Sequence, residues 1–260
     1  MKREKRRRRP RSGRTEPEQV LYRPGPVQPG QIVGIEGAEA DHAVRSLRLR
    51  SGDAVWLTDG AGSRHHGVVH TIGKHRLEVD VHGTEPVVRW PRREVWLGAG
   101  VIRTARMDVL VEKASELGVT RFVPLALARC VARPEEGGTK AERWHRIAVE
   151  SLKQSKRAFL MELGEPTGLD DFLRVVPTGA TLAFADPGGP GPAGLPRGTG
   201  PLVLLVGPEG GLEPEERDTL LQAGAIPVAL GGNRLRAETA GLTLVTSVLA
   251  VLGEMEPAGD

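Results

Sequence analysis

Two glycine-rich stretches decide the fold of this 260-residue chain. The first is GPEGG at residues 207–211, directly after the apolar run LVLLV at 202–206. The second is LGGNRLRAETA at residues 230–240, which closes the apolar run 225–230 and leads into the apolar segment 241–252. Short, fully apolar runs are typical of parallel strands buried on both faces. Both stretches therefore follow predicted strands, at the edge where open α/β sheets bind ligands.

Glycine suits a ligand-binding wall because it lets the backbone approach a ligand closely, and helix amino termini offer unpaired N–H donors. The two stretches thus predict two walls of one pocket. Neither stretch fits the G-x-G-x-x-G dinucleotide pattern or the phosphate loop that ends in Gly-Lys-Ser/Thr, so nicotinamide and nucleoside-triphosphate sites lose their main support. Composition alone leaves open that both are ordinary tight turns.

Outward from these stretches, residues 93–255 alternate between strand-like and helical patterns. This alternation predicts a parallel sheet with helices on both faces. Gly118 is expected to end one helix in the left-handed conformation, and the Gly/Pro-rich segment 186–200 is expected to be a loop. The predicted strands are 94–98, 121–127, 182–185, 202–206 and 225–230, and the predicted helices are 107–117, 140–156, 214–223 and 241–252.

Residues 20–84 show a different rhythm of short β-type runs, with strict alternation at 76–81 and turn residues at 59–60 and 72–73. One short helix is expected to start near residues 39–42. The pattern predicts a small, mostly antiparallel β-barrel, and residues 85–92 are interpreted as a linker.

The positive charge of the chain is concentrated at its start. Residues 1–14 hold nine Lys or Arg and one acid, whereas the rest of the chain holds 27 Lys or Arg against 32 Asp or Glu. Such a run repels itself and has nothing apolar to bury, so residues 1–19 are predicted to form a disordered basic tail. Phosphate binding and a merely solubilising role both stay open for it.

Several classes of protein are disfavoured by composition. No run approaches the roughly 20 apolar residues of a membrane-spanning helix, and no apolar stretch follows the basic start as a secretory signal requires. Cys130 is the single cysteine, which excludes an internal disulfide and a cysteine-based zinc cage. Adjacent residues on a strand face opposite ways, so His65 and His66 make a poor chelate and are read as a turn-exposed pair. We expect a cytoplasmic protein without metal or membrane association.

The two glycine-rich stretches resemble the signature loops of the RsmE family, the 16S rRNA uridine-N3 methyltransferases of the SPOUT superfamily. The resemblance rests on residues 207–211, on Leu230-Gly231 and on LRAETA at 235–240. Residues 41–53 are similar to the start of the family's PUA-like domain, and EKASELG at 112–118 matches a middle motif. The chain departs from the family at Arg103-Thr104, at Lys156, where a small residue is usual, and at Leu160, where a proline is common. These departures concern the choice of target more than the cofactor.

The resemblance implies a SPOUT-type α/β trefoil-knot methyltransferase domain at 93–255, preceded by a PUA-like RNA-binding β-barrel at 20–84. It implies S-adenosylmethionine as cofactor, 16S rRNA or the small ribosomal subunit as partner, and a homodimer. Carried over residue by residue, the cofactor would contact Ala185, Asp186, Val206, Gly207, Glu209, Gly210, Leu230, Gly231, Leu235, Thr239 and Ala240.

Methylation of a uracil N3 requires that the ring lose its N3 proton, because the protonated nitrogen has no lone pair free for attack. Glu209 and Glu238 are the carboxylates nearest the predicted pocket, and either could be the general base. Both could instead stabilise helix amino termini. Arg236 is the stronger catalytic candidate, since it could stabilise charge on the uracil oxygens.

RNA binding is expected from basic clusters on both domains, because phosphate contacts need positive charge whatever the sequence read. Aromatic residues make up 3% of the chain, too few for stacking platforms, so recognition by shape is favoured. The candidates are Arg45, Arg48 and Arg50 on the barrel, and Arg103, Arg106, Lys153, Lys156 and Arg157 on the second domain. Two alternatives stay open: a paralogue with another rRNA target, and a non-catalytic RNA-binding assembly factor.

Overall fold

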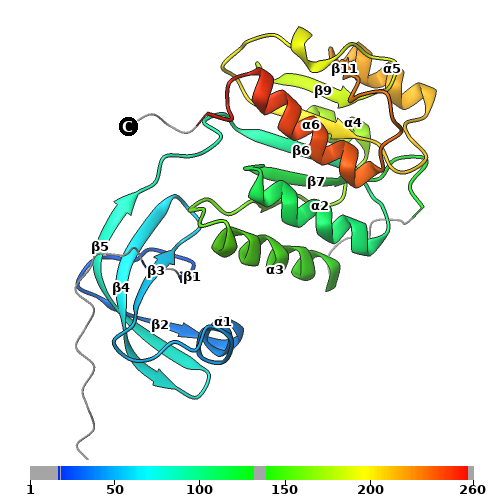
Figure 1. Ribbon diagram of the computed structural model, residues 1–260. Helices are drawn as coiled ribbons and strands as arrows, with labels where there is room; N and C mark the ends of the chain where they lie inside the picture. The colour runs from blue at the N-terminus through cyan, green and yellow to red at the C-terminus, as the bar shows by residue number, and fades with distance from the viewer. Residues whose placement is uncertain (1–16, 18, 132–138, 257–260) are drawn as a thin grey trace, which may run out of the picture.

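The computed structural model describes Pro17, residues 19–131 and residues 139–256. The predicted basic tail lies, apart from Pro17 and Gln19, outside the described residues. The described chain forms two units, a β-rich one built from the first third of the sequence and a larger α/β one built from the rest (Figure 1). The predicted two-part organisation therefore has a structural counterpart.

The first unit is a five-stranded sheet in the order β1-β3-β4-β5-β2. All neighbouring strands are antiparallel except β1 and β3, which are parallel. The alternation at 76–81 places Leu77, Val79 and Val81 in a shared core with residues of every other strand. The strands are β1 Val20–Tyr22, β2 Ile32–Glu36, β3 Ala54–Thr58, β4 Ser63–Gly73 and β5 Arg76–Pro86, and helix α1 Gly37–Asp41 continues into a π-helical turn, η1 His42–Ser46.

Three details of this unit differ from the sequence-based expectation. The turn between β4 and β5 is at 74–75 and not at 72–73, because Gly73 still pairs with Arg76 across the hairpin. Strand β5 runs through Pro86, so the predicted linker begins inside a strand. Strand β1 was not predicted, and the Gln19 carbonyl next to it accepts a hydrogen bond from the Trp56 N–H at 2.9 Å. Pairing with β3 makes a strand of this three-residue segment, which is too short for a periodic pattern.

The second unit is a six-stranded sheet in the order β11-β9-β10-β6-β7-β8, and every pair in it is parallel. This confirms the predicted parallel sheet. Its strands are β6 Val95–Gly100, β7 Arg121–Leu125, β8 Glu162–Leu163, β9 Thr181–Ala185, β10 Leu202–Val206 and β11 Ile226–Val228. Its helices are α2 Thr104–Glu116, α3 Thr139–Gln154, α4 Leu169–Arg174, the short 3-10 turn η2 Pro192–Gly194, α5 Pro214–Gln222 and α6 Ala237–Val251.

Helices cover both faces of this sheet (Figure 1). Leu110 of α2 and Leu244 of α6 share one apolar core with Leu204 of β10, whereas Phe172 of α4 and Leu220 of α5 belong to a second core. All residues of β10 are buried, as its uninterrupted apolar run predicted. Gly118 ends α2 with a φ of 87°, which confirms the predicted left-handed cap.

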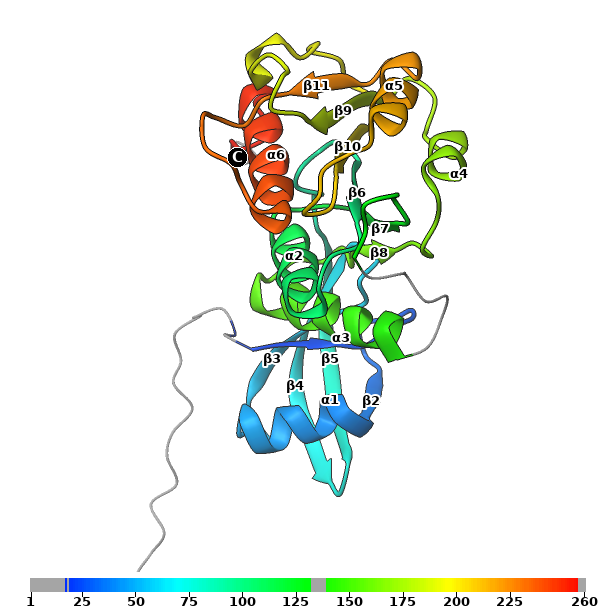
Figure 2. The ribbon, with the colours of Figure 1, turned by 90° about the vertical axis from the view of Figure 1, so that its right-hand side faces the viewer.

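The two units meet along helix α3, which lies between the β-rich unit and the rest of the α/β unit (Figure 2). The Lys153 side chain is 7% exposed, and its ammonium contacts Glu39 of α1 at 2.6 Å and Glu150 at 2.8 Å. Glu39 also accepts a hydrogen bond from the Tyr22 N–H at 3.0 Å. The charge of Lys153 is thus paired with carboxylates inside the junction. The expectation that it contacts RNA does not fit this position, and we assign it a structural role.

Arg157 lies in the same junction and donates a hydrogen bond to the Ser115 carbonyl. Burial lowers the pKa of its guanidinium to about 10, with a smaller effect from the nearby Arg89. This arginine is therefore directed inward as well. A lone sequence cannot separate such a residue from a surface cation, because both occur in the same basic cluster.

We expect the Lys153→Met variant to lower the free energy of unfolding by about 3 kcal/mol, since removing one partner leaves the part-buried carboxylate of Glu39 without its counter-charge. The double variant Lys153→Met/Glu39→Gln should recover part of this loss, because it removes both charges. Denaturant unfolding of the full chain, followed by circular dichroism, measures both. Equal stability of Lys153→Met and the wild type would contradict the structural role.

Candidate cofactor and substrate site

The carboxyl edge of the parallel sheet carries the candidate site. Strand β9 lies between β11 and β10, so the segments that follow these three strands are neighbours at one edge although they are far apart in sequence. Together they enclose a cavity of about 970 Å³. A cavity of this size is in the range that holds small molecules and cofactors.

The cavity unites both glycine-rich stretches, as predicted. All but one of the residues expected to contact the cofactor line it, namely Ala185, Asp186, Val206, Gly207, Glu209, Gly210, Leu230, Gly231, Leu235 and Ala240. The exception is Thr239, an exposed residue that is not part of the lining. Helix α6 begins at Ala237 and not at Gly241, so Thr239 lies in its first turn. Ala237 and Ala240 of this turn line the cavity, whereas Thr239 lies on another side of the helix.

Glycines shape the first loop in two places. Gly211 has a φ of 76°, a left-handed conformation that residues with a Cβ rarely adopt. Gly100, at the end of β6, has no room for a side chain, because a Cβ there would lie 2.6 Å from the Pro208 nitrogen. The first loop therefore packs directly on the backbone of the neighbouring strand. This role of Gly100 was not predicted from the sequence.

Arg129 holds this loop from the other side. Its guanidinium contacts the Glu213 carboxylate at 2.8 and 2.9 Å and donates to the Gly210 carbonyl at 3.0 Å. Glu213 is the N-cap of α5 and shares a capping box with Glu216, which also accepts a hydrogen bond from the Ala128 N–H at 2.7 Å. The segment after β7 is thus tied to the first glycine-rich loop, a contact that joins residues more than 80 positions apart.

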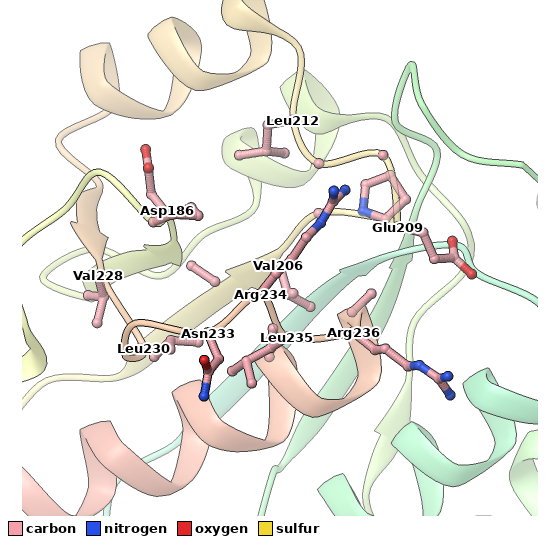
Figure 3. A pocket seen from close by; sticks show the side chains of 18 of the residues that line it. Asp186, Val206, Glu209, Leu212, Val228, Leu230, Asn233, Arg234, Leu235 and Arg236 are labelled. Carbon is pink, nitrogen blue, oxygen red and sulfur yellow. The ribbon is translucent and has the colours of Figure 1, made fainter.

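The two ends of the cavity differ chemically (Figure 3). Asp186 and Val228 lie at one end, whereas Glu209 and Arg236 lie at the other. The Asp186 carboxylate accepts hydrogen bonds from the Gly188 N–H at 2.8 Å and from Arg217 at 2.6 Å. Apolar side chains form much of the wall between the ends, among them Val206, Leu212, Leu230 and Leu235. The lining therefore offers an acidic group at each end of an apolar wall.

The Glu209 end contains a second carboxylate and an arginine. Arg106, in the first turn of α2, lies 3.7 Å from Glu209 through Nη1 and 3.7 Å from Glu238 through Nε. The Oε2 atoms of both glutamates are buried and have no hydrogen-bond partner within the described chain. Arg106 and Glu209 line the cavity, but Glu238 does not. The three side chains form what we call the acidic cluster, and it was not expected that Arg106 would belong to it.

The geometry bears on the alternative that these glutamates only stabilise helix ends. Glu238 is in the first turn of α6, where an acid interacts favourably with the helix dipole. Glu209 is not in the first turn of a helix, because the helix that follows it, α5, has Glu213 as its N-cap. Of the two candidate bases, Glu209 alone both lines the cavity and lacks a capping role.

Arg236 is the N-cap residue of α6. The preceding strand, β11, ends eight residues earlier, at Val228. The Arg236 side chain is exposed at the cavity rim, and no hydrogen bond or ion pair joins it to any other residue that the structure describes. Arg234 also lines the cavity and points across it toward the first loop (Figure 3). Sequence reasoning missed Arg234, although its place inside the second glycine-rich stretch was a signal.

The other predicted RNA contacts lie on the surface. Arg45, Arg48, Arg50, Arg103 and Lys156 are exposed, and Arg45 has one carboxylate neighbour, Asp41, at 3.8 Å. The φ of Lys156 is 55°, a left-handed conformation that a side chain disfavours. Glycine alone would adopt this conformation without steric cost. As RNA contacts, these residues stay a prediction.

No group of three or more His, Cys, Asp or Glu side chains suited to a metal occurs in the described ranges. His65 and His66 are not in a turn as expected but in β4, where His65 is buried against Thr84 and His66 packs on Trp56. Within the same ranges, no helix has the length and apolar character needed to span a bilayer.

Comparison with known proteins agrees with this architecture. Residues 89–249 match the model of a family described as an RNA methyltransferase domain, and residues 35–81 match an RNA methyltransferase PUA domain. The chain is 30% identical over 239 residues to the ribosomal RNA small subunit methyltransferase E of Mycobacterium bovis, covering 84% of this chain and 86% of the relative. The chain belongs to the ribosomal RNA small subunit methyltransferase E family. This confirms the family inferred from the two glycine-rich stretches.

Solved structures of the family share the fold over nearly the whole chain. The methyltransferase E of Neisseria gonorrhoeae, whose crystal structure contains S-adenosyl methionine, superposes with a TM-score of 0.84 at 27% identity and covers 90% of this chain and 97% of its own. A probable rRNA methyltransferase from Porphyromonas gingivalis superposes with a TM-score of 0.78 at 30% identity, with coverages of 90% and 98%. The architecture of the methyltransferase E family, a PUA-type unit followed by an α/β unit with a parallel sheet, is therefore that of this chain.

Proposed function

We propose that this protein methylates the N3 atom of a uridine in 16S rRNA and thereby acts in maturation of the small ribosomal subunit. It is an S-adenosylmethionine-dependent rRNA methyltransferase by family. The observation that carries the proposal is the cavity in which both signature loops and the acidic cluster meet. The finer assignment, uridine N3, rests on the family resemblance and on the chemistry of the cluster.

The lining fits S-adenosylmethionine, a cation with an aromatic base at one end. Its adenine would lie against the apolar wall at Val228, Leu230 and Leu235, and its sulfonium charge would be compensated by carboxylates such as Glu209. Glycines on both loops leave room for the ligand and expose backbone donors. When bound, the cofactor supplies an electrophilic methyl group.

The chain itself must take the N3 proton from the uracil. Glu209 is the better placed of the two candidate bases, because it lines the cavity and its Oε2 atom has no donor in the described chain. An unused acceptor at the reacting end of a pocket is what a general base requires. Arg236, free at the rim, is suited to hold a phosphate or a uracil oxygen.

RNA would lie across both units, which we assign as a PUA-like RNA-binding domain at 20–86 and a methyltransferase domain at 93–255, joined by residues 87–92. The exposed arginines on the first unit and Arg103 and Lys156 on the second are positioned to contact phosphates. Binding through such contacts should weaken steeply with salt. We further propose a cytoplasmic homodimer, with a trefoil knot in the second domain as the family resemblance implies.

Two alternatives lead to different outcomes. A paralogue would bind the cofactor and methylate another rRNA nucleotide, for example in self-protection against an antibiotic, with the departures at Arg103-Thr104 and Lys156 as its support. A non-catalytic assembly factor would bind RNA without binding S-adenosylmethionine. The intact lining of the cavity speaks against the second alternative.

The test combines two measurements on the purified full chain. Isothermal titration with S-adenosylmethionine should give saturable binding, and small ribosomal subunits from cells that lack the enzyme should take up labelled methyl groups at one uridine N3, located by mapping the modified nucleotide. Methylation elsewhere would establish the paralogue. Absence of cofactor binding at millimolar ligand would sink the methyltransferase proposal and leave the assembly factor.

A further inference from the structure

Arg106 differs from the other well-paired arginines of the structure in how it meets its carboxylates. Arg143 contacts Asp108 at 2.6 Å, and Arg217 contacts Asp186 at 2.6 Å. Arg106 stands 3.7 Å from both Glu209 and Glu238, beyond hydrogen-bonding distance. The two carboxylates hold its charge in place from two sides without using its N–H donors.

Arg106 and Glu209 are adjacent, and both residues line the cavity. A guanidinium has five N–H donors, and none of those on Arg106 donates a hydrogen bond to another residue in the described ranges. The Glu209 carboxylate next to it accepts no hydrogen bond from a described residue; its Oε2 atom is buried, whereas the side chain as a whole is 25% exposed. Both residues line the same cavity, and the Arg106 side chain is 33% exposed, so a ligand can reach it. The acidic cluster thus presents a donor beside an acceptor.

We propose that Arg106 and Glu209 together read the imide edge of the target base, with Arg106 donating to a ring carbonyl and Glu209 accepting the adjacent ring N–H. This inference rests on the proposed function and deepens it. Uracil offers N3–H beside C4=O, which complements this pair. Cytosine has an N3 without a hydrogen atom beside an amino group. Glu209 would then face an acceptor and Arg106 a donor, so neither hydrogen bond could form. Guanine shares the N–H and C=O arrangement, and mapping the product separates it from uracil.

The same contact serves the chemistry. When Glu209 takes the N3 proton, the electron pair of the N–H bond stays on the ring and its negative charge spreads to the flanking carbonyl oxygens. A guanidinium donating to such an oxygen stabilises the anion more than the neutral base. Glu238, on the far side of Arg106, positions it. Arg106 is therefore assigned as a substrate-reading residue and not as a phosphate contact of the RNA backbone.

The experiment compares Arg106→Met and Arg106→Lys with the wild type on small ribosomal subunits. We expect kcat for Arg106→Met to fall about 100-fold, as on removal of one oxyanion donor, while the Kd for S-adenosylmethionine measured by titration changes by less than about threefold. Arg106→Lys should retain the charge without the planar fork and lose about tenfold in kcat. Arg174→Met, which removes an exposed arginine on α4, is the control and should behave as the wild type.

A second arm uses subunits in which the mapped uridine is replaced by cytidine, on which the wild type should produce no methylated base. Methylation of the cytidine, or a kcat of Arg106→Met within about threefold of the wild type, would overturn the inference. Loss of cofactor binding in a folded Arg106→Met would also overturn it, by making Arg106 a cofactor residue. If the Arg106→Met variant does not fold, the Arg106→Lys variant takes its place in the test. A kcat of Arg106→Lys equal to that of the wild type would then contradict the assignment. Failure of the wild type to bind S-adenosylmethionine refutes the proposed function instead.

Discussion

The Glu209→Gln variant is expected to lose two to four orders of magnitude in kcat for methyl transfer while it still binds S-adenosylmethionine, with a weaker affinity because the charge that compensates the sulfonium is lost. General-base catalysis by a positioned side chain contributes roughly 10²–10⁴-fold. Glutamine keeps the size of the side chain, but it carries no charge and cannot accept the N3 proton. The measurement is single-turnover methylation of small ribosomal subunits, with the cofactor Kd determined separately by titration.

Glu238→Gln is the matched control for this variant, because both glutamates contact Arg106 at 3.7 Å but Glu238 does not line the cavity. We expect it to lose about tenfold at most, through the positioning of Arg106. A larger loss for Glu238→Gln than for Glu209→Gln would assign the base to Glu238. Equal rates for Glu209→Gln and the wild type would exclude a proton transfer to Glu209.

The Gly210→Trp variant is expected to raise the Kd for S-adenosylmethionine at least about 100-fold. Gly210 lines the cavity, and a Cβ at this position would already lie 3.0 Å from the Cβ of Arg129. The indole would therefore project toward Arg129 and displace it, and with it the first glycine-rich loop, which forms one wall of the cavity. A 100-fold change corresponds to about 2.8 kcal/mol, and isothermal titration resolves it.

Gly191→Trp provides the control for bulk and hydrophobicity. Gly191 is outside the cavity lining, its φ is −66°, and an added Cβ there meets no atom within 4 Å. We expect its cofactor affinity to equal that of the wild type. If Gly210→Trp bound the cofactor with unchanged affinity and the same fold by circular dichroism, the ligand would have to lie elsewhere.

The contrast between Gly210 and Arg106 shows why part of the site could be predicted. Gly210 belongs to a glycine-rich stretch at the end of a fully apolar run, and this local pattern is tied to one edge of a parallel sheet. Arg106 carries no local pattern that separates it from Arg103, three residues earlier on the same chain segment. Packing separates them, since Arg103 is exposed whereas α2 places Arg106 between two carboxylates from other elements.

Lys153 makes the same point for the fold. Helical spacing around Trp144, Ile147, Ala148 and Leu152 predicted helix α3, and the structure has it at Thr139–Gln154. The sequence could not say that the β-rich unit would cover the side of this helix on which Lys153 lies, because its partner Glu39 is more than 100 residues away. A basic residue on a helix was therefore read as a surface cation.

By itself, the sequence determined the features that depend on neighbours along the chain: the parallel sheet, the strands of the first unit other than β1, the left-handed cap at Gly118 and the two loops that form the cavity. Periodicity and glycine placement act over a few residues, so they can be read directly. The tertiary structure alone decided which charged groups meet. It buried Lys153, brought Arg106 to Glu209 and Glu238, and left Thr239 outside the cavity. These contacts join distant segments, and their energies depend on burial and distance that no local pattern encodes.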